Sequence, residues 1–541
     1  MSEPSSLIAR RAREASRSDI SGRAITATAS VFRSTLFPPG LEAAKVDCAG
    51  EPDFFIDLNL DQVVAAIVAK RDEEVLRPIF YSPYRNEEIV CYRQAVFSDL
   101  ERPDVFQLFP AFTEAMRSVR ANLSYADQIS YPSHKHTVFL RAARLYCEAV
   151  GVLAHDLRSA APQSSGLRHL LRYLETYLAS PAFRLFLEET AELRDTLSKL
   201  SYGMLFRGDR VTVRKYASEP DYTVTILERF AKFREIEVKS PARRKPTDDF
   251  SLNHIEQAIL EFVSRLFPEQ FHNLAAYVAR HTSFIDETVA RFDREIGFYA
   301  AYLDFIAPLK RAGLLFCRPD VSVSSKETTV EDSFDLALAA KLIQERGSIV
   351  CNGFHLSGRE RLLVVSGPNQ GGKTTFARMF GQLHFLAGLG CPVPGKSAQL
   401  FLPDRIFTHF EREEDIVNLR GKLEEELVRL RASCAAMTSN SVIVLNEIFN
   451  STSLDDQVFL STKVIERMLA ADAIGVCVTF IDGLSTLSDK TVSMVSTVDP
   501  DDPARRTFEI IRKRADGLAY ALSLAQKRGV TYDQLRRRVR P

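Results

Sequence analysis

Apolar residues recur at helical spacing through most of the first 310 residues of the chain. The blocks in which they stand three or four positions apart are 112–123, 138–157, 167–177 and 253–310. In a helix this spacing places the apolar side chains along one face, which can then be buried. We therefore predict a mainly α-helical domain over residues 51–330, preceded by a poorly ordered segment at residues 1–50.

Two short segments inside this helical region alternate polar and apolar residues instead. Residues 210–214 and 222–226 both show the two-residue period that is typical of strands. They predict a small β element near residues 208–228. A polar, proline-flanked stretch at 240–246 follows and is typical of a linker.

Beyond residue 330 the pattern changes to short apolar runs that alternate with helical segments. Residues 362–365 and 441–445 are continuous apolar runs of the length expected for buried strands. Strands that alternate with helices usually form a parallel sheet with helices on its faces. We therefore predict that residues 331–541 form an α/β domain with a mostly parallel sheet and flanking helices.

A glycine-rich loop lies between the first of these strands and a helical segment. It reads GPNQGGKT at residues 367–374, which fits the phosphate-loop pattern G-x-x-x-x-G-K-[ST] in its required strand-to-helix setting. Backbone N–H groups of such a loop and the helix N-terminus attract phosphate oxygens. The candidate nucleotide-binding residues are Gly367, Pro368, Asn369, Gln370, Gly371, Gly372, Lys373, Thr374 and Thr375. Lys373 is expected to contact the β and γ phosphates, and Thr374 to bind Mg²⁺.

The second apolar strand ends in Asn446 and Glu447. In P-loop ATPases a carboxylate at this place orients the attacking water, and the residue before it supports Mg²⁺. The ends of neighbouring parallel strands are also where chemistry occurs in open α/β sheets. We therefore assign Glu447, together with Lys373, as the candidate catalytic pair, and Thr374 with Asn446 as candidate metal ligands.

Residues 331–541 resemble the ATPase domain of the MutS DNA mismatch-repair family. The family reads G-P-N-M-G-G-K-S-T, where this chain has GPNQGGKTT at 367–375, and its D-E-I-G-R-G-T-S-x-x-D is similar to the segment 446–456. Residues 389–394, 404–408 and 519–530 are similar to further family segments. Upstream the resemblance is weaker, although residues 93–97 partly resemble the family's R-Q-x-x-V/I segment.

The resemblance implies ATP and Mg²⁺ as cofactors and an ATPase that acts as a homodimer on mismatched, branched or duplex DNA. It implies that Asn352 lines the nucleotide site. Other positions matched to the family as trans-acting or sensing residues are Gly421, Lys422, Asp456 and Asp482. A C-terminal helix-turn-helix would support dimerisation, and Thr531 with Gln534 has capping-box spacing for a final helix.

The chain departs from the family pattern at functional positions. Asn446 replaces an aspartate beside the metal, which removes a negative charge and predicts slow hydrolysis, and Phe480 stands where the family has a switch histidine. We expect the family's mismatch-reading domain to be absent. Two alternatives therefore stay open beside a weak, DNA-coupled ATPase: a nucleotide-gated scaffold with little hydrolysis, and a clamp on RNA or ribosomes.

The composition of the chain excludes several classes of protein but does not itself indicate a function. The formal net charge is zero, so a nucleic-acid surface has to come from local patches. The eight cysteines include no C-x-x-C pair, and no apolar run approaches the length of a membrane span. We therefore expect a cytoplasmic protein with reduced thiols. The chain also lacks the G-x-S-x-G elbow of serine hydrolases and the paired Cys/His spacing of zinc sites.

Overall fold

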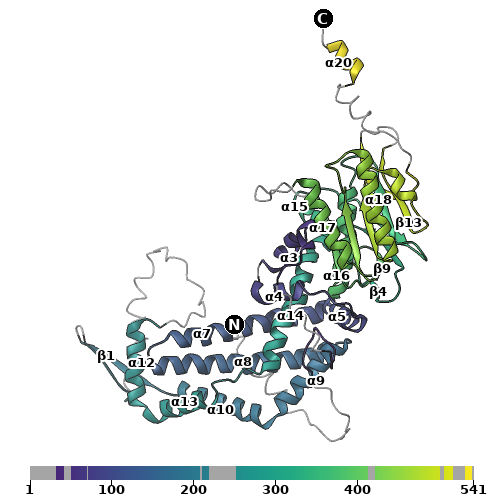
Figure 1. The fold of residues 1–541 in the computed structure, drawn as a ribbon. Helices are drawn as coiled ribbons and strands as arrows, with labels where there is room; N and C mark the ends of the chain where they lie inside the picture. Colours follow the sequence, from purple (N-terminus) through teal and green to yellow (C-terminus); the bar gives the residue numbers. More distant parts are fainter. Residues whose placement is uncertain are drawn as a thin grey trace, which may run out of the picture. The chain divides into compact units, whose positions relative to one another are not determined.

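The computed structural model describes residues 32–41, 50–69, 71–207, 210–217, 252–411, 421–499, 505–515 and 531–538. The chain divides into two compact units (Figure 1). The described residues of the first unit lie within Gln107–Ala161 and Leu171–Asp293. Those of the second lie within Thr28–Phe106, Pro162–Leu170 and Arg294–Pro541. The predicted domain boundary near residue 330 remains a prediction.

The first unit is built on two long helices that pack along their length. These are α7 (Leu108–Gln128) and α8 (Pro132–Ala160), and α10 (Pro181–Ser198), α12 (His254–Leu266) and α13 (Pro268–Arg280) pack on α8. Aromatic side chains fill the space between them: Phe186 stacks on Tyr277, and Phe284 meets Phe139 edge to face. The helical spacing read from the sequence therefore corresponds to a buried aromatic seam.

A two-stranded hairpin projects from the helices of this unit (Figure 1). Strands β1 (Tyr202–Arg207) and β2 (Arg210–Lys215) pair antiparallel, and β2 contacts α12. The predicted strand at 210–214 lies in β2. The predicted strand at 222–226 and the linker at 240–246 lie outside the described residues, and the partner of β2 is β1, which the sequence did not indicate.

The second unit contains a six-stranded sheet in the order β10-β11-β12-β7-β13-β14. The strands are β10 (Ile406–His409), β11 (Val442–Asn446), β12 (Ile474–Val478), β7 (Leu362–Ser366), β13 (Thr491–Val498) and β14 (Arg506–Arg512). Neighbours from β10 to β13 pair parallel, and β14 pairs antiparallel with β13. Strands β7 and β12 are buried over their whole length, which explains their continuous apolar sequences.

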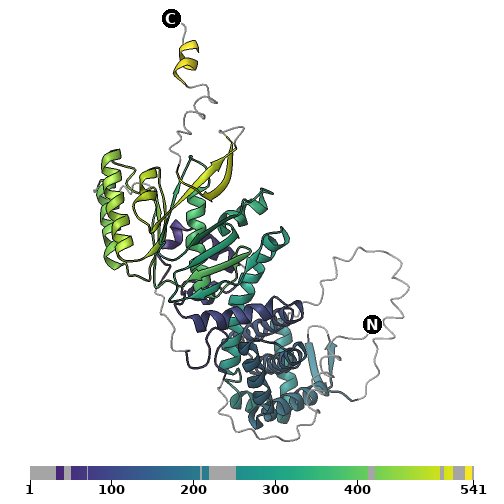
Figure 2. The same cartoon turned by 90° about the vertical axis from the view of Figure 1, so that its right-hand side faces the viewer.

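Helices cover this sheet. Helices α17 (Lys422–Ala436) and α18 (Leu454–Ala470) contribute Leu430, Ile465 and Met468 to one apolar cluster with alternate residues of β7 and β11. Figure 2 shows both helices on the same side of the sheet. Helix α16 (Lys373–Leu389) packs against β11 and β12. The α/β architecture predicted for this region is therefore present.

Smaller elements complete the second unit. Its N-terminal helices are α2 (Phe54–Asp57), α3 (Leu60–Val68), α4 (Glu73–Phe80), α5 (Glu87–Leu100) and α6 (Pro103–Phe106). Helices α9 (Ser165–Ala179) and α14 (Glu287–Arg311) run through the division between the units, and α15 (Leu336–Gln344), η1 (Asp482–Thr486) and α20 (Tyr532–Arg538) follow along the chain. The remaining strands are β3 (Phe316–Cys317), β4 (Asp320–Ser322), β5 (Thr328–Ser333), β6 (Asn352–Leu356), β8 (Val393–Pro394) and β9 (Ser397–Phe401).

The N-terminal helices press closely on α16. A Cβ atom at Gly381 would lie 2.7 Å from a methyl of Leu58, and one at Gly390 would lie 2.8 Å from Cβ of Arg93. The guanidinium of Arg93 is buried and donates to the carbonyls of Leu36 and Leu389. Helix α16 is thus held between the sheet and helices that come from the start of the chain.

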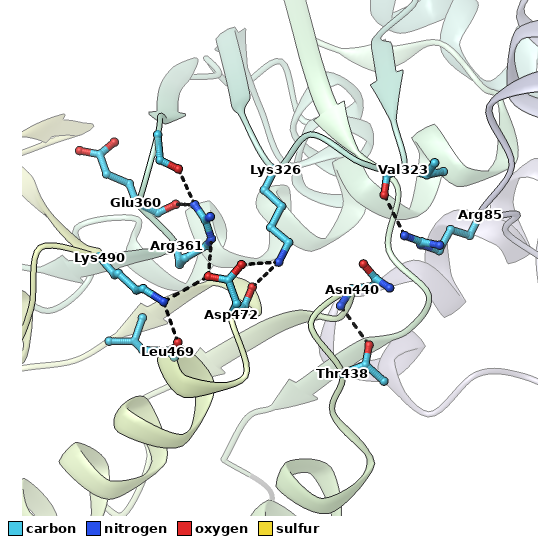
Figure 3. Close-up of polar contacts among 11 residues, drawn as sticks. Arg85, Val323, Lys326, Glu360, Arg361, Thr438, Asn440, Leu469, Asp472 and Lys490 are labelled. Carbon is cyan, nitrogen blue, oxygen red and sulfur yellow. Dashed lines mark hydrogen bonds and ion pairs between the residues drawn. The ribbon is translucent and has the colours of Figure 1, made fainter.

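One carboxylate joins the ends of several strands (Figure 3). Asp472, in the turn before β12, accepts hydrogen bonds from Lys326, Arg361 and Lys490. Burial alone would raise the pKa of Asp472, but the three cations outweigh it and lower the pKa to about 2. This stabilisation is present above the ordinary aspartate pKa and is lost only as the pH falls toward 2.

Among the described helices, none combines the length and the apolar character that crossing a lipid bilayer requires.

Near the C-terminus, α20 begins directly after Thr531. The Thr531 backbone N–H and hydroxyl both donate to the side-chain carbonyl of Gln534. The final helix therefore begins where the capping-box spacing predicted it.

Candidate nucleotide-binding site

The glycine-rich loop connects the buried strand β7 to α16, as the sequence predicted. Gly367 and Gly372 have φ angles of +118° and +88°, which favour glycine. A Cβ atom at Gly371 would lie 2.3 Å from Oγ of Ser496, and that hydroxyl donates to the Gly371 carbonyl. Strand β13 therefore packs against the loop through Ser496. Glycine is required at Gly371 because a side chain has no room there, and it is favoured at Gly367 and Gly372 because their φ angles are positive.

Lys373 is the first residue of α16, and only 4% of it is exposed. Its ammonium donates to the carbonyls of Gly367 at 3.0 Å and Pro368 at 3.1 Å. Burial lowers the pKa of Lys373, while the negative charge of Glu447 opposes that shift. The chain thus places a buried cation directly at the N-terminus of a helix, where anions are favoured.

The two predicted metal ligands lie together. The Thr374 hydroxyl in the first turn of α16 donates to Oδ1 of Asn446 at 2.9 Å, at the carboxyl end of β11. Both side chains offer neutral oxygen atoms, which are among the ligands that Mg²⁺ accepts. Their contact connects the phosphate loop to the end of a strand that is not adjacent to β7 in the sheet.

Glu447 follows Asn446 in an unusual backbone conformation. Its φ angle is +51°, and its N–H donates to the carbonyl of Val478 on β12. Oε2 of Glu447 accepts from Asn450, whose own side-chain carbonyl accepts from Gln457 on α18. Backbone conformations of this kind cluster at functional sites and are held by their surroundings. Neither Asn450 nor Gln457 was predicted, because side-chain relays of this kind have no local sequence pattern.

Glu426 on α17 supports the same loop. Its carboxylate accepts from the backbone N–H of Phe449 at 2.7 Å and contacts Nε2 of His409 at 3.1 Å. Phe449 has a φ angle of +60° at the position where the family pattern has glycine, and its ring is buried. Burial of the ring and the Glu426 contact offset the cost of that conformation, which explains why a phenylalanine is tolerated there.

A cavity of about 480 Å³ opens in front of the loop. Of the predicted residues, it is lined by Asn352, Glu447 and the loop from Asn369 to Thr375. Gly367 and Pro368 lie behind it, where their carbonyls accept from Lys373. The structure therefore gathers the phosphate loop and the candidate catalytic carboxylate around one space.

The rest of the cavity wall is largely apolar and was not predicted. Helix α15 and the following segment contribute Leu338, Leu342, Ile349 and Val350, and the other apolar residues of this wall are Phe334, Phe376, Met379 and Phe508. Leu338 and Leu342 have helical i, i+4 spacing, so the sequence could indicate their helix but not which cavity it faces. An apolar slot beside a phosphate loop has the character of a site for a flat nucleobase.

Asn352 lines the cavity, but its amide is already engaged. Its Oδ1 accepts from the backbone N–H of Ile510 at 2.7 Å, and its Nδ2 donates to the carbonyl of Phe508 at 3.1 Å. Both partners belong to β14. In this arrangement Asn352 fixes the strand that carries Phe508, and its role toward a nucleotide remains a prediction.

The positions matched to trans-acting or sensing residues do not line the cavity. Gly421 precedes the first residue of α17, Lys422, whose side chain lies outside the described part of the structure. Asp456 accepts from the Ser453 hydroxyl at the start of α18, and Asp482 is the first residue of η1. These assignments remain predictions.

Comparison with known proteins finds a family match for part of the chain. Residues 363–528 match the model of MutS domain V. This part of the chain is therefore similar to the MutS family. It is 34% identical over 146 residues to the DNA mismatch repair protein MutS of Rickettsia bellii (strain OSU 85-389), which is 26% of this chain and 16% of that protein. It is 31% identical over 188 residues to the protein of the same name from an Exiguobacterium species (strain ATCC BAA-1283 / AT1b), which is 34% of this chain and 22% of the relative.

The match to these MutS relatives covers about a quarter to a third of the chain. The DNA mismatch repair protein MutS of Rickettsia typhi is 30% identical over 178 residues, which is 31% of this chain and 20% of that protein. The chain thus spans about a fifth of the length of the curated relatives it matches. The matched family domain holds the glycine-rich loop from Gly367, the Asn446–Glu447 pair and strands β11 to β14.

Proposed function

We propose that this chain binds ATP with Mg²⁺ in the cavity and couples the state of the nucleotide to binding of DNA, in a role related to mismatch repair. The observation that carries the proposal is the convergence at one cavity of the phosphate loop, the helix N-terminus with Lys373, and the Thr374–Asn446 contact. The names of the relatives support the pathway.

Each side chain has a role that follows from its place. The loop N–H groups and Lys373 would bind the phosphates, and the apolar wall with Leu338 and Met379 would accept the base. Thr374 and Asn446 would hold Mg²⁺, which neutralises phosphate charge when bound. Glu447, oriented by Asn450, would accept a hydrogen bond from the attacking water and receive its proton.

A nucleotide-gated scaffold with little hydrolysis is the second candidate, and Asn446 is the observation that favours it. An amide brings no negative charge to the metal site, so Mg²⁺ affinity and turnover are both reduced relative to a carboxylate. Replacing the amide of Asn446 by a carboxylate therefore distinguishes the ATPase from the nucleotide-gated scaffold.

The variant Asn446→Asp is expected to raise the rate of ATP hydrolysis about tenfold, equivalent to about 1.4 kcal/mol of the barrier. Half-maximal activity should also shift to lower Mg²⁺ concentration. Release of phosphate by the purified protein measures both effects. Glu447→Gln, alone and with Asn446→Asp, should reduce the rate to background while nucleotide still binds. If Asn446→Asp leaves a negligible rate unchanged, the scaffold is correct and the ATPase is not.

The β1–β2 hairpin offers the best surface for nucleic acid in the first unit. The strand register places Arg207, Arg210 and Arg214 on one face of the hairpin, and all three are exposed. The stretch 199–217 contains five lysine or arginine residues and one acidic residue, although the net charge of the chain is zero. Arginine contacts to phosphates provide most of the sequence-independent affinity for DNA.

The double variant Arg210→Ala/Arg214→Ala is expected to weaken binding of duplex DNA about tenfold at moderate salt, because two phosphate contacts are lost. The slope of log affinity against log salt should fall by about two. Fluorescence anisotropy over a salt series measures both quantities. Thr212→Ala, on the same face between the two arginines, is the matched control and should change neither. Equal affinity and slope in the double variant would remove the hairpin from the DNA surface.

We also propose that the chain works as a homodimer. Exposed apolar side chains gather on the neighbouring helices α17 and α18: Leu427, Val428, Leu454, Val458 and Phe459. An apolar patch on contacting helices favours association with another protein surface. A second copy fits because Gly421, Lys422 and Asp456, the positions matched to trans-acting residues, lie in the first turns of these helices or directly before them.

A further inference from the structure

Phe480 occupies a position between the two nucleotide motifs. It follows β12, the strand that separates β7 from β11. The Thr479 N–H donates to the carbonyl of Val365 on β7, and the Thr479 hydroxyl accepts from the N–H of Ile481, which fixes the turn. The Phe480 ring is 47% exposed. A half-exposed phenylalanine at the end of a buried strand contributes little to the core, so its position calls for another explanation.

The ring lies directly over the phosphate-loop lysine. The ammonium nitrogen of Lys373 is 4.1 Å from the ring centroid of Phe480. The same ammonium donates to the carbonyls of Gly367 and Pro368. Two carbonyls and one aromatic face therefore occupy the three N–H donors of the lysine, since the face of a ring carries partial negative charge.

A triphosphate would compete with this arrangement more than a diphosphate would. In a phosphate loop the lysine reaches the β and γ phosphates, so a triphosphate has to displace two of these three contacts. The Phe480 ring has no hydrogen-bond donor with which to bind the γ phosphate, and an apolar group does not compensate the charge of an anion. A diphosphate needs only the β contact, so it displaces one contact and can leave the Lys373–Phe480 contact in place.

We propose that Phe480 determines nucleotide specificity in this chain, by holding Lys373 and thereby favouring a nucleoside diphosphate over a triphosphate. The inference rests on the proposed nucleotide site. Phe480 acts through Lys373, so it is a specificity-determining residue and not a catalytic one. In this account the chain rests in a diphosphate-bound state, and entry of a triphosphate requires the ring to release the ammonium.

The test compares the dissociation constants of ADP and of a nonhydrolysable ATP analogue, measured by titration calorimetry with Mg²⁺ present. The wild-type chain should bind the analogue more weakly than ADP. In Phe480→Leu, which keeps an apolar side chain but removes the ring, the ratio of the two constants should fall about tenfold, as expected for a cation–π contact whose ammonium is buried. Most of the change should come from tighter binding of the analogue. Phe480→His should lower the ratio at least as much, because an imidazole can donate to phosphate.

Phe459→Leu is the matched control. Phe459 is 59% exposed on α18, and the ammonium of Lys463 lies 6.0 Å from its ring centroid. Neither ring lines the cavity, but only the Phe480 ring contacts the lysine of the phosphate loop. Its replacement should leave the ratio unchanged. The inference is overturned if the wild-type chain binds the analogue as tightly as ADP, or if the ratio stays within twofold of wild type in both Phe480 variants. A wild-type chain that binds neither nucleotide would instead contradict the proposed function itself.

Discussion

Lys373→Ala is expected to weaken binding of ATP about 100-fold, because one buried charge-assisted contact to the phosphates is lost. Lys373 is buried at the N-terminus of α16 and lines the cavity, so water replaces its ammonium poorly. Without it, the loop N–H groups and the helix dipole alone compensate the triphosphate. The effect should appear as a rise in the dissociation constant with little change in stability, because the contacts of the ammonium among the described residues are with the loop carbonyls and the Phe480 ring.

Calorimetric or fluorescence titration of ATP measures this prediction. Lys396→Ala is a suitable control, because Lys396 lies in the same unit, its side chain is 62% exposed, and its ammonium lies 3.8 Å from the carboxylate of Glu331. It should bind ATP as the wild-type chain does. If Lys373→Ala binds ATP with unchanged affinity, the phosphates do not lie at the glycine-rich loop.

Arg93→Ala is expected to lower the free energy of unfolding by about 3–5 kcal/mol, as removal of other buried, fully engaged charged groups does. Arg93 is only 1% exposed. The aromatic rings that surround its guanidinium belong to Phe37, Tyr84 and Phe298. Its loss would leave the carbonyls of Leu36 and Leu389 without their donor and would open a cavity beside Gly390.

Urea unfolding followed by circular dichroism measures the change in stability. Arg85→Ala is the matched control: Arg85 donates to the carbonyl of Val323 (Figure 3) and lies over the ring of Phe401, but its hydrogen bond is exposed. Its loss should cost less than about 1 kcal/mol. A cost below that value for Arg93→Ala as well would show that the contacts of the N-terminal segment with α16 contribute little to the fold.

The sequence predicted the parts of the site that depend on local pattern. The runs at 362–365 and 441–445 are buried strands, and the loop between β7 and α16 has the shape that its glycines indicate. The nearness of Thr374 to Asn446 followed from a general property of parallel sheets, since the carboxyl ends of their strands share one edge.

The remaining features depend on contacts between distant residues, which local periodicity does not contain. Nothing in the sequence pattern indicated that β12 separates β7 from β11, so the contact of Phe480 with Lys373 was not predicted either. The pattern did not indicate β1, because the sequence of that strand, YGMLFR, does not alternate polar and apolar residues. The apolar wall with Leu338 and Phe508 was missed for the same reason, since its members come from α15 and β14.

The family resemblance, by contrast, indicated where residues such as Asn352 lie more reliably than it indicated which residues they contact. Asn352 does line the cavity, but its amide binds β14, and the family's glycine is here Phe449 in the same backbone region. Side chains such as Asn450 and Gln457, which orient Glu447, are features of this chain. Substitutions at functional positions therefore have to be interpreted from their neighbours and not from the motif alone.

A crystal structure of the chain with Mg²⁺ and a nonhydrolysable ATP analogue would show whether ATP binds at the glycine-rich loop. We expect phosphates within hydrogen-bonding distance of the loop N–H groups and of Lys373, the metal at Thr374 and Asn446, and the base against Leu338 and Met379. An analogue bound elsewhere, or a loop that stays closed to phosphate at saturating concentration, would contradict it.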